Sequence, residues 1–519
     1  AVAIAVGFIA SRVSAGIGRD LRRDVFRTVV GYSNAEIEKF STASLITRTT
    51  NDIQQVQFVC VILLRMVAYA PILGIGGILH VAGGNTGLTW IIFVAVAALL
   101  FFFNGGLGFL YDFDLAFADH FARVREIFTG YYKTPANQPD LNLRFSNVVA
   151  DLMLPQRALL GGWAMGIPAL YLLISSVREK SYRQTALLAL WAAALPLVHT
   201  HTFLALALFS GGYLLGNLIE HREDRCGVLL RAGLYLAVVL ALALPQLVGN
   251  AVRQTLEGGA LRFQFNWVNN SGGRGLKDGY FWFWVKNAGL PFILTVCACL
   301  CARKRGNLDI VLGMTAIYVV AETILFQPNE YDNNKLFYIW FMFAMILAAD
   351  YGSMLMQRLA GLPGRALLCG LFLWASVFSG ALSLGREAVS GYQLFSANAV
   401  AAGDWIRENT DRDDVFLTGQ QHINPVCSLA GRQIICGSDL YVFFHGLDYS
   451  QQSADCRRFY ENPRENADVL ETYNVHYIYV SDYERAEFDV DLYALDEAYE
   501  LIYANDDVRI YDAGWRETP

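Results

Sequence analysis

Long apolar runs separated by short polar loops dominate the chain. A helix that crosses a bilayer needs roughly 20 largely apolar residues, and several runs reach or approach that length. We expect spans over residues 1–10 (in part), 58–79, 88–110, 158–176, 184–198, 202–219, 227–249, 288–302, 309–327, 335–352 and 365–384. The pattern predicts a mainly α, polytopic transmembrane helical protein with about ten spans. The runs 184–198 and 202–219 predict a hairpin of short helices, of which the first is too short to cross comfortably.

The pattern changes from about Phe395, where the sequence becomes polar and acidic. Short apolar strings such as VFLTG at 415–419 and VHYIYVSD at 475–482 are typical of strands, and helix signals such as NADVLETY lie beside them. We therefore expect a C-terminal soluble α/β domain over residues 395–519.

Composition supports a membrane protein and excludes some partners. Of the 519 residues, 55% are hydrophobic and 17% charged, and the mean hydropathy is +0.34. The net charge of −7 leaves no basic surface for nucleic acid. Cys297, Cys299 and Cys301 lie in an apolar run, where packing explains them better than a metal or redox role. The opening AVAIAVGFIASR lacks a basic region before its apolar stretch, so we interpret it as the tail of a longer hydrophobic segment rather than a signal peptide.

Basic residues cluster in a subset of the loops, which predicts an orientation. Lys and Arg concentrate in cytoplasmic loops of membrane proteins, so the loops at 177–183, 221–225, 302–306 and 358–365 are expected inside. The loops at 112–157, 199–201, 250–287 and 328–335 and the C-terminal domain then share the outer face. This predicts a multi-pass protein of a bacterial plasma (inner) membrane with an extracytoplasmic C-terminal domain.

The first hundred residues contain strings of a distinct kind. They are GRDLRRDVFRTVV at 18–30, the segment Ile37–Phe40, SLITRTTNDIQQVQ at 44–57 and RMVAYAPILGIGGI at 65–78, with TWIIFVAVAALL at 89–100 as the next helix. These strings resemble the membrane domain of ABC exporters, in which a short coupling helix between long cytoplasmic helices docks on an ATPase. From the basic residues alone, an amphipathic helix lying on the cytoplasmic surface is the alternative.

This resemblance implies ATP-driven export and names a coupling segment. Residues 1–100 would be an ABC-exporter-like transmembrane fragment, and the segment would comprise Glu36, Lys39, Phe40, Ser41 and Thr42. The chain contains no G-x-x-x-x-G-K-[ST] phosphate loop. ATP is therefore expected only through a separate ATPase partner.

The larger part of the chain carries a second set of strings in order along the predicted outer face. They are NGGLGF at 104–109, LPQR at 154–157, PLVHTHTF at 196–203, FWVKNAG at 283–289 and DNNKLFYIW at 332–340. With the predicted architecture, they resemble the GT-C class of polytopic glycosyltransferases and related uncharacterised bacterial membrane proteins. The resemblance implies that residues 101–394 form a membrane domain that transfers a sugar from a polyprenyl-phosphate donor at the outer membrane face.

The two halves disagree by one membrane crossing. If residues 11–57 are cytoplasmic, spans 58–79 and 88–110 return the chain to the inside at Asp112, whereas the later loops require Asp112 outside. A join of two unrelated membrane proteins near Leu100–Asn104 explains this, as a real fusion or as a chimera created by a deletion or an assembly error. Alternatively, one apolar run does not span.

Asp112 and Asp114 are the expected catalytic residues. In GT-C enzymes an acidic residue of the first outer loop holds a metal or activates the acceptor, and YDFD has that spacing. Two carboxylates one residue apart can share a divalent cation, and either can act as a general base. The alternative is a solvated loop pair.

Basic and polar residues near predicted span ends are the expected substrate ligands. Arg157 at the start of a span suits bidentate phosphate binding or interfacial snorkelling. His199 and His201 could hold a metal or orient a carboxylate, or serve as hydrogen-bonded interface histidines. Asp332, Asn334 and Lys335 precede an aromatic span, where ionisable groups are costly, and an N-cap formed by Asp332 or Asn333 is the compatible alternative.

Other polar and aromatic residues are expected to bind the acceptor substrate or to anchor a helix at the membrane interface. The stretch GYFWFWVKN at 279–287 most simply anchors a helix at the interface. In the C-terminal domain, His422 and Arg432, with His445 and Asp448, are expected to read an acceptor. A non-catalytic envelope scaffold remains a third class of function.

Overall fold

The computed structural model describes residues 86–112, 126–129, 134–220, 222–248, 261–270, 278–327, 329–391, 393–444 and 447–514, with a few isolated residues between Arg12 and Arg27. Asp114, His445 and the coupling segment Glu36–Thr42 lie outside the described residues. The expectations placed on them therefore stay predictions.

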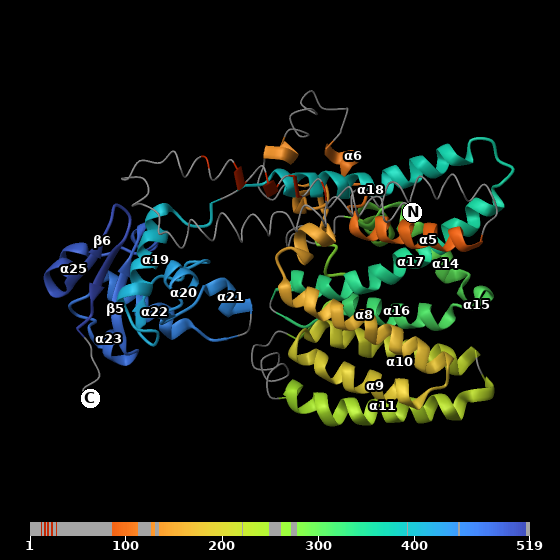
Figure 1. Cartoon of the computed structure of the whole chain (residues 1–519), viewed down its shortest axis with the longest axis horizontal. Helices are drawn as coiled ribbons and strands as arrows, with labels where there is room; N and C mark the ends of the chain where they lie inside the picture. Colours follow the sequence, from red (N-terminus) through yellow and green to blue (C-terminus); the bar gives the residue numbers. More distant parts are fainter. Residues whose placement is uncertain are drawn as a thin grey trace. The chain divides into compact units, whose positions relative to one another are not determined.

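Helices make up most of the described chain before residue 390 (Figure 1). They are α5 (Thr86–Phe102), α6 (Phe109–Asp112), α8 (Arg157–Arg178), α9 (Tyr182–Ala194), α10 (Thr200–Glu220), α11 (Arg225–Gln246), α13 (Tyr280–Ala288), α14 (Leu290–Leu300), α15 (Ala302–Arg305), α16 (Leu308–Thr323), α17 (Asn334–Arg358) and α18 (Arg365–Val389). Short 3-10 or π turns join some of them: η2 (Pro139–Leu141), η3 (Val149–Met153), η4 (Leu195–Leu197), η5 (Arg222–Asp224) and η8 (Glu330–Asn333).

Five helical segments of the described chain are long and apolar enough to cross a membrane. They are Arg157–Arg178, Thr200–Glu220, Arg225–Gln246, Glu330–Arg358 and Arg365–Val389. The pair α13 and α14 gives a sixth if it counts as one span, although the two helices meet at 118°. The described chain is that of a multi-pass helical membrane protein, with fewer established spans than the ten predicted. As expected, α9 is short, with 13 residues.

Two helix ends differ from the predicted runs for local reasons. The run 88–110 becomes α5, which ends at Phe102, because Asn104, Gly105 and Gly106 follow. The run 288–302 becomes α14, which begins only at Leu290 because Gly289, with φ +79°, joins α13 to α14 at their bend. A left-handed φ is readily adopted only by glycine, so this residue sets the position of the bend.

The chain divides into two compact units, each built from separate stretches of sequence. Unit 1 comprises residues 1–155, 271–314 and 338–386, and unit 2 comprises 156–270, 315–337 and 387–519. In unit 2, α9 packs against α8 and α11, and α10 packs against α8. Strand β1 (Arg262–Phe263) pairs antiparallel with β2 (Ile324–Leu325) and ties the segment 261–270 to the end of α16.

The part of unit 2 from residue 393, called here the tail, is an α/β fold around a five-stranded sheet of order β4-β3-β5-β7-β6. Its strands are β3 (Val415–Leu417), β4 (Gln433–Ile434), β5 (Val475–Val480), β6 (Glu500–Ala504) and β7 (Arg509–Asp512). Its helices are α19 (Ala397–Asn409), α20 (Pro425–Leu429), α21 (Asp439–Phe444), α22 (Ser450–Glu461), α23 (Asp468–Thr472), α24 (Asp482–Glu487) and α25 (Leu492–Ala498). β3 is parallel to β4 and β5, whereas β7 is antiparallel to β5 and β6.

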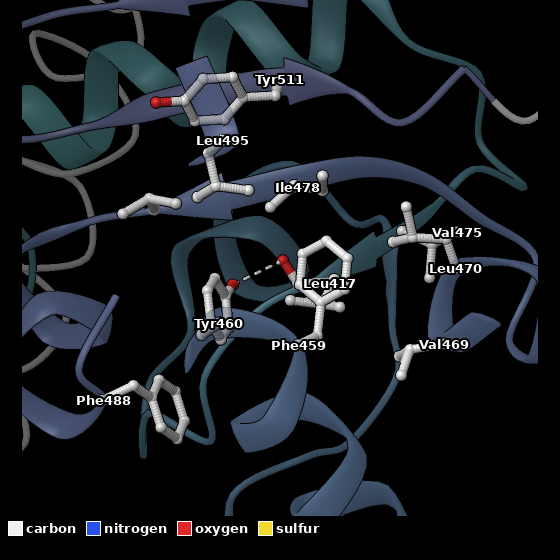
Figure 2. Packing of buried hydrophobic residues seen from close by; sticks show 11 residues of the cluster. Leu417, Phe459, Tyr460, Val469, Leu470, Val475, Ile478, Phe488, Leu495 and Tyr511 are labelled. Carbon is white, nitrogen blue, oxygen red and sulfur yellow. Dashed lines mark hydrogen bonds between the residues drawn. The ribbon is translucent and has the colours of Figure 1, made fainter. Parts of the chain in front are cut away.

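Alternating side chains give the tail two apolar layers, one on each face of the sheet. Leu417 and Ile478 belong to one cluster with Tyr460, whereas the adjacent Phe416 and Tyr479 belong to the other. This is the period-two alternation of a sheet covered on both faces. Figure 2 shows the first cluster, in which the Tyr460 hydroxyl donates to the carbonyl oxygen of Leu417 at 3.1 Å.

Candidate functional site

Asp112 lies at the end of α6, a short helix that follows α5 after a turn. Its side chain is buried, with 5% of its surface exposed, and Gln138 Nε2 donates to its Oδ1 at 2.8 Å. Burial of a carboxylate is costly unless it is hydrogen-bonded. Asp112 is therefore buried in unit 1 with Gln138 as a hydrogen-bond partner and is not a solvated loop residue.

Asparagine side chains fasten the segment after Gln138 to the end of α5. Asn104 Nδ2 donates to the carbonyl of Ser146 at 2.7 Å, and Asn104 Oδ1 accepts from the N–H of Val148 at 2.9 Å. Asn147 Nδ2 donates to the carbonyl of Asn104 at 2.8 Å. All of these polar groups are buried, so each is satisfied by a partner in the chain rather than by water.

The C-terminal end of α13 fastens the same segment from another side. Asn287 Oδ1 accepts from the backbone N–H of Arg144 and Phe145, at 2.8 and 3.0 Å. Lys286 Nζ, whose side chain is only 3% exposed, donates to the carbonyl of Leu141 at 2.8 Å and to Asp278 Oδ2 at 2.5 Å. A buried ammonium needs such a carboxylate partner.

Close backbone approach completes this polar framework of unit 1. The N–H of Leu107 donates to the carbonyl of Lys286 at 2.8 Å, and a Cβ added to Gly106 would lie 2.2 Å from the same oxygen. Gly106 also has φ +57°. Only glycine fits here, so NGGLGF holds α13 against the turn that leads to Asp112.

His199 is a second predicted residue with a defined geometry, in unit 2. The N–H of Thr202 donates to His199 Nδ1 at 3.3 Å, and Thr202 Oγ1 lies 2.8 Å from the same nitrogen. Because Nδ1 accepts a backbone N–H, Nε2 carries the proton of the neutral ring. Burial, and after it the charge of Lys335, lowers the pKa of His199 to about 4, so the ring is neutral at physiological pH.

Two neighbouring histidines lie within electrostatic range of a lysine that is distant in sequence. The rings of His199 and His201 lie 5.5 Å apart, and the positive charge of Lys335 acts on both. Lys335 Nζ lies 3.0 Å from Asp332 Oδ1, and both side chains are largely buried. This cluster of unit 2 offers a cation and an N–H donor, which are groups that bind phosphate.

The loop before α17 is fixed by its asparagines. Asn333 Nδ2 donates to the carbonyls of Ala321 and Ile324, both at 2.9 Å. Asn334 is 1% exposed, and within the described part of the chain its Oδ1 makes no hydrogen bond. An amide oxygen left in this state is costly, and a ligand that donates to it would offset the cost.

The remaining expected ligands lie on surfaces. Arg157 is exposed at the first turn of α8, as both phosphate binding and snorkelling require. His422 is exposed in the tail, where its Nε2 lies 2.9 Å from the hydroxyl of Tyr441. Arg432 donates to the carbonyls of Arg407 and Thr410 at the end of α19, at 3.0 and 2.7 Å, which is a helix-capping arrangement. Its expected contact with an acceptor stays a prediction.

The described residues by themselves do not form a metal site. No three His, Cys, Asp or Glu side chains in the described ranges come together as a set of metal ligands. A divalent cation takes several oxygen ligands, so Asp112 would need Asp114 and further donors.

Sequence reasoning missed the residues that build the framework around Asp112. Gln138, Asp278, Lys286 and Asn287 were not proposed for the site, although Lys286 and Asn287 stand inside the quoted string FWVKNAG. A Lys-Asn pair after an aromatic run was the available signal, since charged and amide side chains are rare at such a place.

Comparison with known proteins gives partial similarities. No family model matches the chain. Over 97 residues, or 19% of the chain, it is 36% identical to uncharacterized ABC transporter ATP-binding proteins of Mycobacterium bovis and Mycobacterium tuberculosis. Over 95 residues it is 34% identical to the uncharacterized ABC transporter ATP-binding protein YfiB of Bacillus subtilis. The matches span 17% of the length of these relatives.

One solved structure resembles a larger part of the chain at low similarity. An oligosaccharyltransferase of Archaeoglobus fulgidus, tethered with an acceptor peptide, matches 88% of this chain and 63% of its own, with a TM-score of 0.35 and 13% identity. Identity at this level carries no residue roles from that enzyme to this chain.

Proposed function

We propose that the chain is a membrane glycosyltransferase of the GT-C type, which transfers a sugar from a polyprenyl-phosphate donor to an acceptor hydroxyl at the outer face of a bacterial plasma membrane. The observation that carries the proposal is the burial of Asp112, which accepts from Gln138 shortly after the apolar helix α5. A carboxylate kept there at the cost of desolvation is a candidate for function.

Asp112 acts as the general base in this reaction. Its carboxylate takes the proton of the acceptor hydroxyl while the hydroxyl oxygen bonds to the anomeric carbon of the sugar. The bond from that carbon to the phosphate oxygen breaks, and the polyprenyl phosphate leaves with the electron pair. Asp114 is the second carboxylate, and together the two supply ligands if a divalent cation takes part.

The cluster of Lys335, His199 and His201 supplies donors for the phosphate. Lys335 contributes a positive charge, and the Nε2–H of the neutral His199 ring contributes a hydrogen bond, because Nδ1 is the nitrogen that accepts from Thr202. Arg157 is a further phosphate ligand at the membrane surface, and Asp332 orients Lys335. The side-chain oxygen of Asn334 accepts a hydrogen bond from a hydroxyl of the polyprenyl-phosphate sugar. In the tail, His422 reads the acceptor.

A transfer assay with conservative variants tests the proposal. We expect Asp112→Asn, alone or with Asp114→Asn, to lower transfer from a radiolabelled polyprenyl-phosphate sugar by about 10²-fold or more, the usual loss when a general base is removed. Asp140→Asn changes an exposed carboxylate in η2, close in sequence to Gln138, and serves as the matched control. Wild-type transfer by the double variant would show that these carboxylates have no catalytic role.

The similarity to ABC transporter proteins supports a second function for the start of the chain. We propose that residues 1–100 are a fragment of an exporter membrane domain joined to the transferase, and that the segment Glu36–Thr42 docks on a separate ATPase. Support comes from the 36% identity over 97 residues. A transport function for the whole chain, or a non-catalytic envelope scaffold, are the alternatives.

Co-purification tests the ATPase partner. An ATPase subunit encoded beside this chain should co-purify with the wild type and be lost from a variant carrying Glu36→Lys, Lys39→Glu and Phe40→Ala. Reversal of the exposed pair Arg407 and Asp404 in the tail is the control. Equal recovery of the ATPase with both variants would exclude docking through this segment.

A further inference from the structure

Exposed apolar side chains of the tail gather at one place. Among the described tail residues, seven large apolar side chains are well exposed: Leu394, Leu440, Tyr441, Phe443, Leu447, Tyr493 and Leu501. Four of them lie between residues 440 and 447, on α21 and directly after it. Their exposed fractions run from 46% for Leu440 to 56% for Leu447. Such grouping on an otherwise polar domain marks an interaction surface.

Backbone bonding holds these four side chains together. The N–H of Leu447 donates to the carbonyl of Val442 at 3.1 Å, so the chain folds back on α21. The Tyr441 hydroxyl is fixed by His422 at 2.9 Å. We call Leu440, Tyr441, Phe443 and Leu447 the α21 surface. It follows the edge strand β4 and lies on the side of the tail away from β6 and α25 (Figure 1).

Charge is sparse along the stretch of the tail that carries the α21 surface. Residues 393–514 contain 23 Asp and Glu against 8 Arg and no Lys, yet residues 415–447 contain only Arg432 and Asp439. Arg432 is turned onto the end of α19 by its backbone hydrogen bonds. The α21 surface is thus apolar with the exposed carboxylates of Asp439 and Asp448 at its two ends, whereas the other 21 acidic residues lie elsewhere in the tail.

The tail is bound by a short linker to a helix long enough to cross a membrane. That helix, α18, ends at Val389, and α19 begins at Ala397. The seven residues between them reach at most roughly 25 Å when extended. Val389 and Leu394 are 60% and 56% exposed, so apolar exposure continues from the lipid-facing helix into the linker. The linker therefore keeps the tail beside the bilayer at high effective concentration.

We propose that the α21 surface rests in the interfacial region of the bilayer from which α18 emerges. Aromatic and aliphatic side chains partition into this region, and tyrosine and phenylalanine are favoured there. The acidic remainder of the tail is repelled by anionic headgroups and stays in water, so the stretch that is sparse in charge is the one that can approach lipid. This role goes beyond the proposed transfer reaction and does not depend on it.

Photo-crosslinking in the full chain tests the contact. The photoreactive residue p-benzoylphenylalanine replaces Phe443 or, independently, Leu440, and the chain is placed in phosphatidylcholine vesicles. Tyr493, which is 76% exposed on α25, carries the same replacement as the matched control. After irradiation, mass spectrometry identifies what each position has captured.

The outcomes separate the possible occupants. We expect lipid adducts at position 443 or 440 at least tenfold above those at position 493. Adducts at 443 and 440 that map to peptides of the same chain, or to a second copy, would overturn the proposal in favour of a protein contact. Lipid adducts no more frequent than at position 493 would also overturn it, since the tail would then stand clear of the membrane.

Discussion

Glu484 shows how one buried carboxylate joins separate parts of the tail. Its Oε1 accepts from the N–H of Gly419 after β3, and its Oε2 accepts from the N–H of Ser481 after β5, both at 2.8 Å. The side chain is fully buried. The sequence predicted strands at 415–419 and 475–482 and a helix signal, but a long-range hydrogen bond between their ends has no local pattern. The same holds for the hydrogen bonds from Arg432 to the carbonyls of Arg407 and Thr410 at the end of α19.

Replacement of Glu484 should weaken the tail in a pH-dependent manner. Glu484→Ala leaves the N–H of Gly419 and of Ser481 without their acceptor and should cost about 1–3 kcal/mol of stability. Burial raises the pKa of Glu484, so the folded tail holds its proton more tightly than the unfolded chain does. The stabilisation from this proton is complete below the unfolded-state pKa and is lost as pH rises through the folded-state pKa.

Hydrogen exchange of β3 and β5 amides in the full chain measures both effects. Glu484→Gln keeps an acceptor oxygen and cannot titrate, so its exchange protection should lack this pH dependence. Identical pH profiles for the wild type and Glu484→Gln would contradict the assignment.

Among the elements, the apolar helices were the most predictable and their interruptions the least. Runs of suitable length predicted α8, α10, α11, α17 and α18, because lipid demands continuous apolar sequence. The bend between α13 and α14 was missed because the aromatic run 280–285 and the apolar run 290–300 lie on either side of Lys286, Asn287 and Gly289 and each fits a helix. Hydropathy does not register a change of direction, whereas a glycine with positive φ permits one.

Gly106→Ala should disrupt the framework around Asp112. The added Cβ would lie 2.2 Å from the carbonyl oxygen of Lys286, and the backbone there has φ +57°. Backbone cannot move aside cheaply, so we expect a loss of about 2 kcal/mol or more and a matching loss of transfer.

Thermal unfolding in detergent and the transfer assay together check this expectation. Gly370→Ala on α18 is the control, because a Cβ added there meets no atom within 4 Å. Wild-type stability and activity of Gly106→Ala would mean that α13 and the turn after α5 are not held together as described.

At the scale of the whole molecule, the burial of residues on either side of the predicted join near Leu100–Asn104 can be examined. Ala95, Ala97 and Leu100, before the join, are buried, as are Phe101 and Asn104 after it. α5 continues without interruption to Phe102. The sequence predicted two unlike parts from their strings, and it could not predict how α5 is buried, because that depends on residues hundreds of positions later.

Long-read sequencing of the source DNA tests whether the joined chain exists. Because α5 continues without interruption to Phe102, with buried residues on both sides of the predicted join, we expect one unbroken read through the codons for residues 90–115. A read of the equivalent region from a second isolate is the control for assembly error. A break near Leu100 would instead mean two proteins, each with its own complete sequence.

Unit 1 has a consequence for how the protein is made. The N–H of Phe109 donates to the hydroxyl of Ser379 at 2.9 Å, a bond between residues 270 positions apart. A ribosome needs on the order of tens of seconds to synthesise that length. For this interval the segment 104–109 must wait beside the translocon without its final partner, with Gly105, which lies against Ser379 and Gly380 in the fold, unshielded. We therefore expect biogenesis of the chain to depend strongly on an insertase that shelters unfinished spans, whatever the stability of the completed protein.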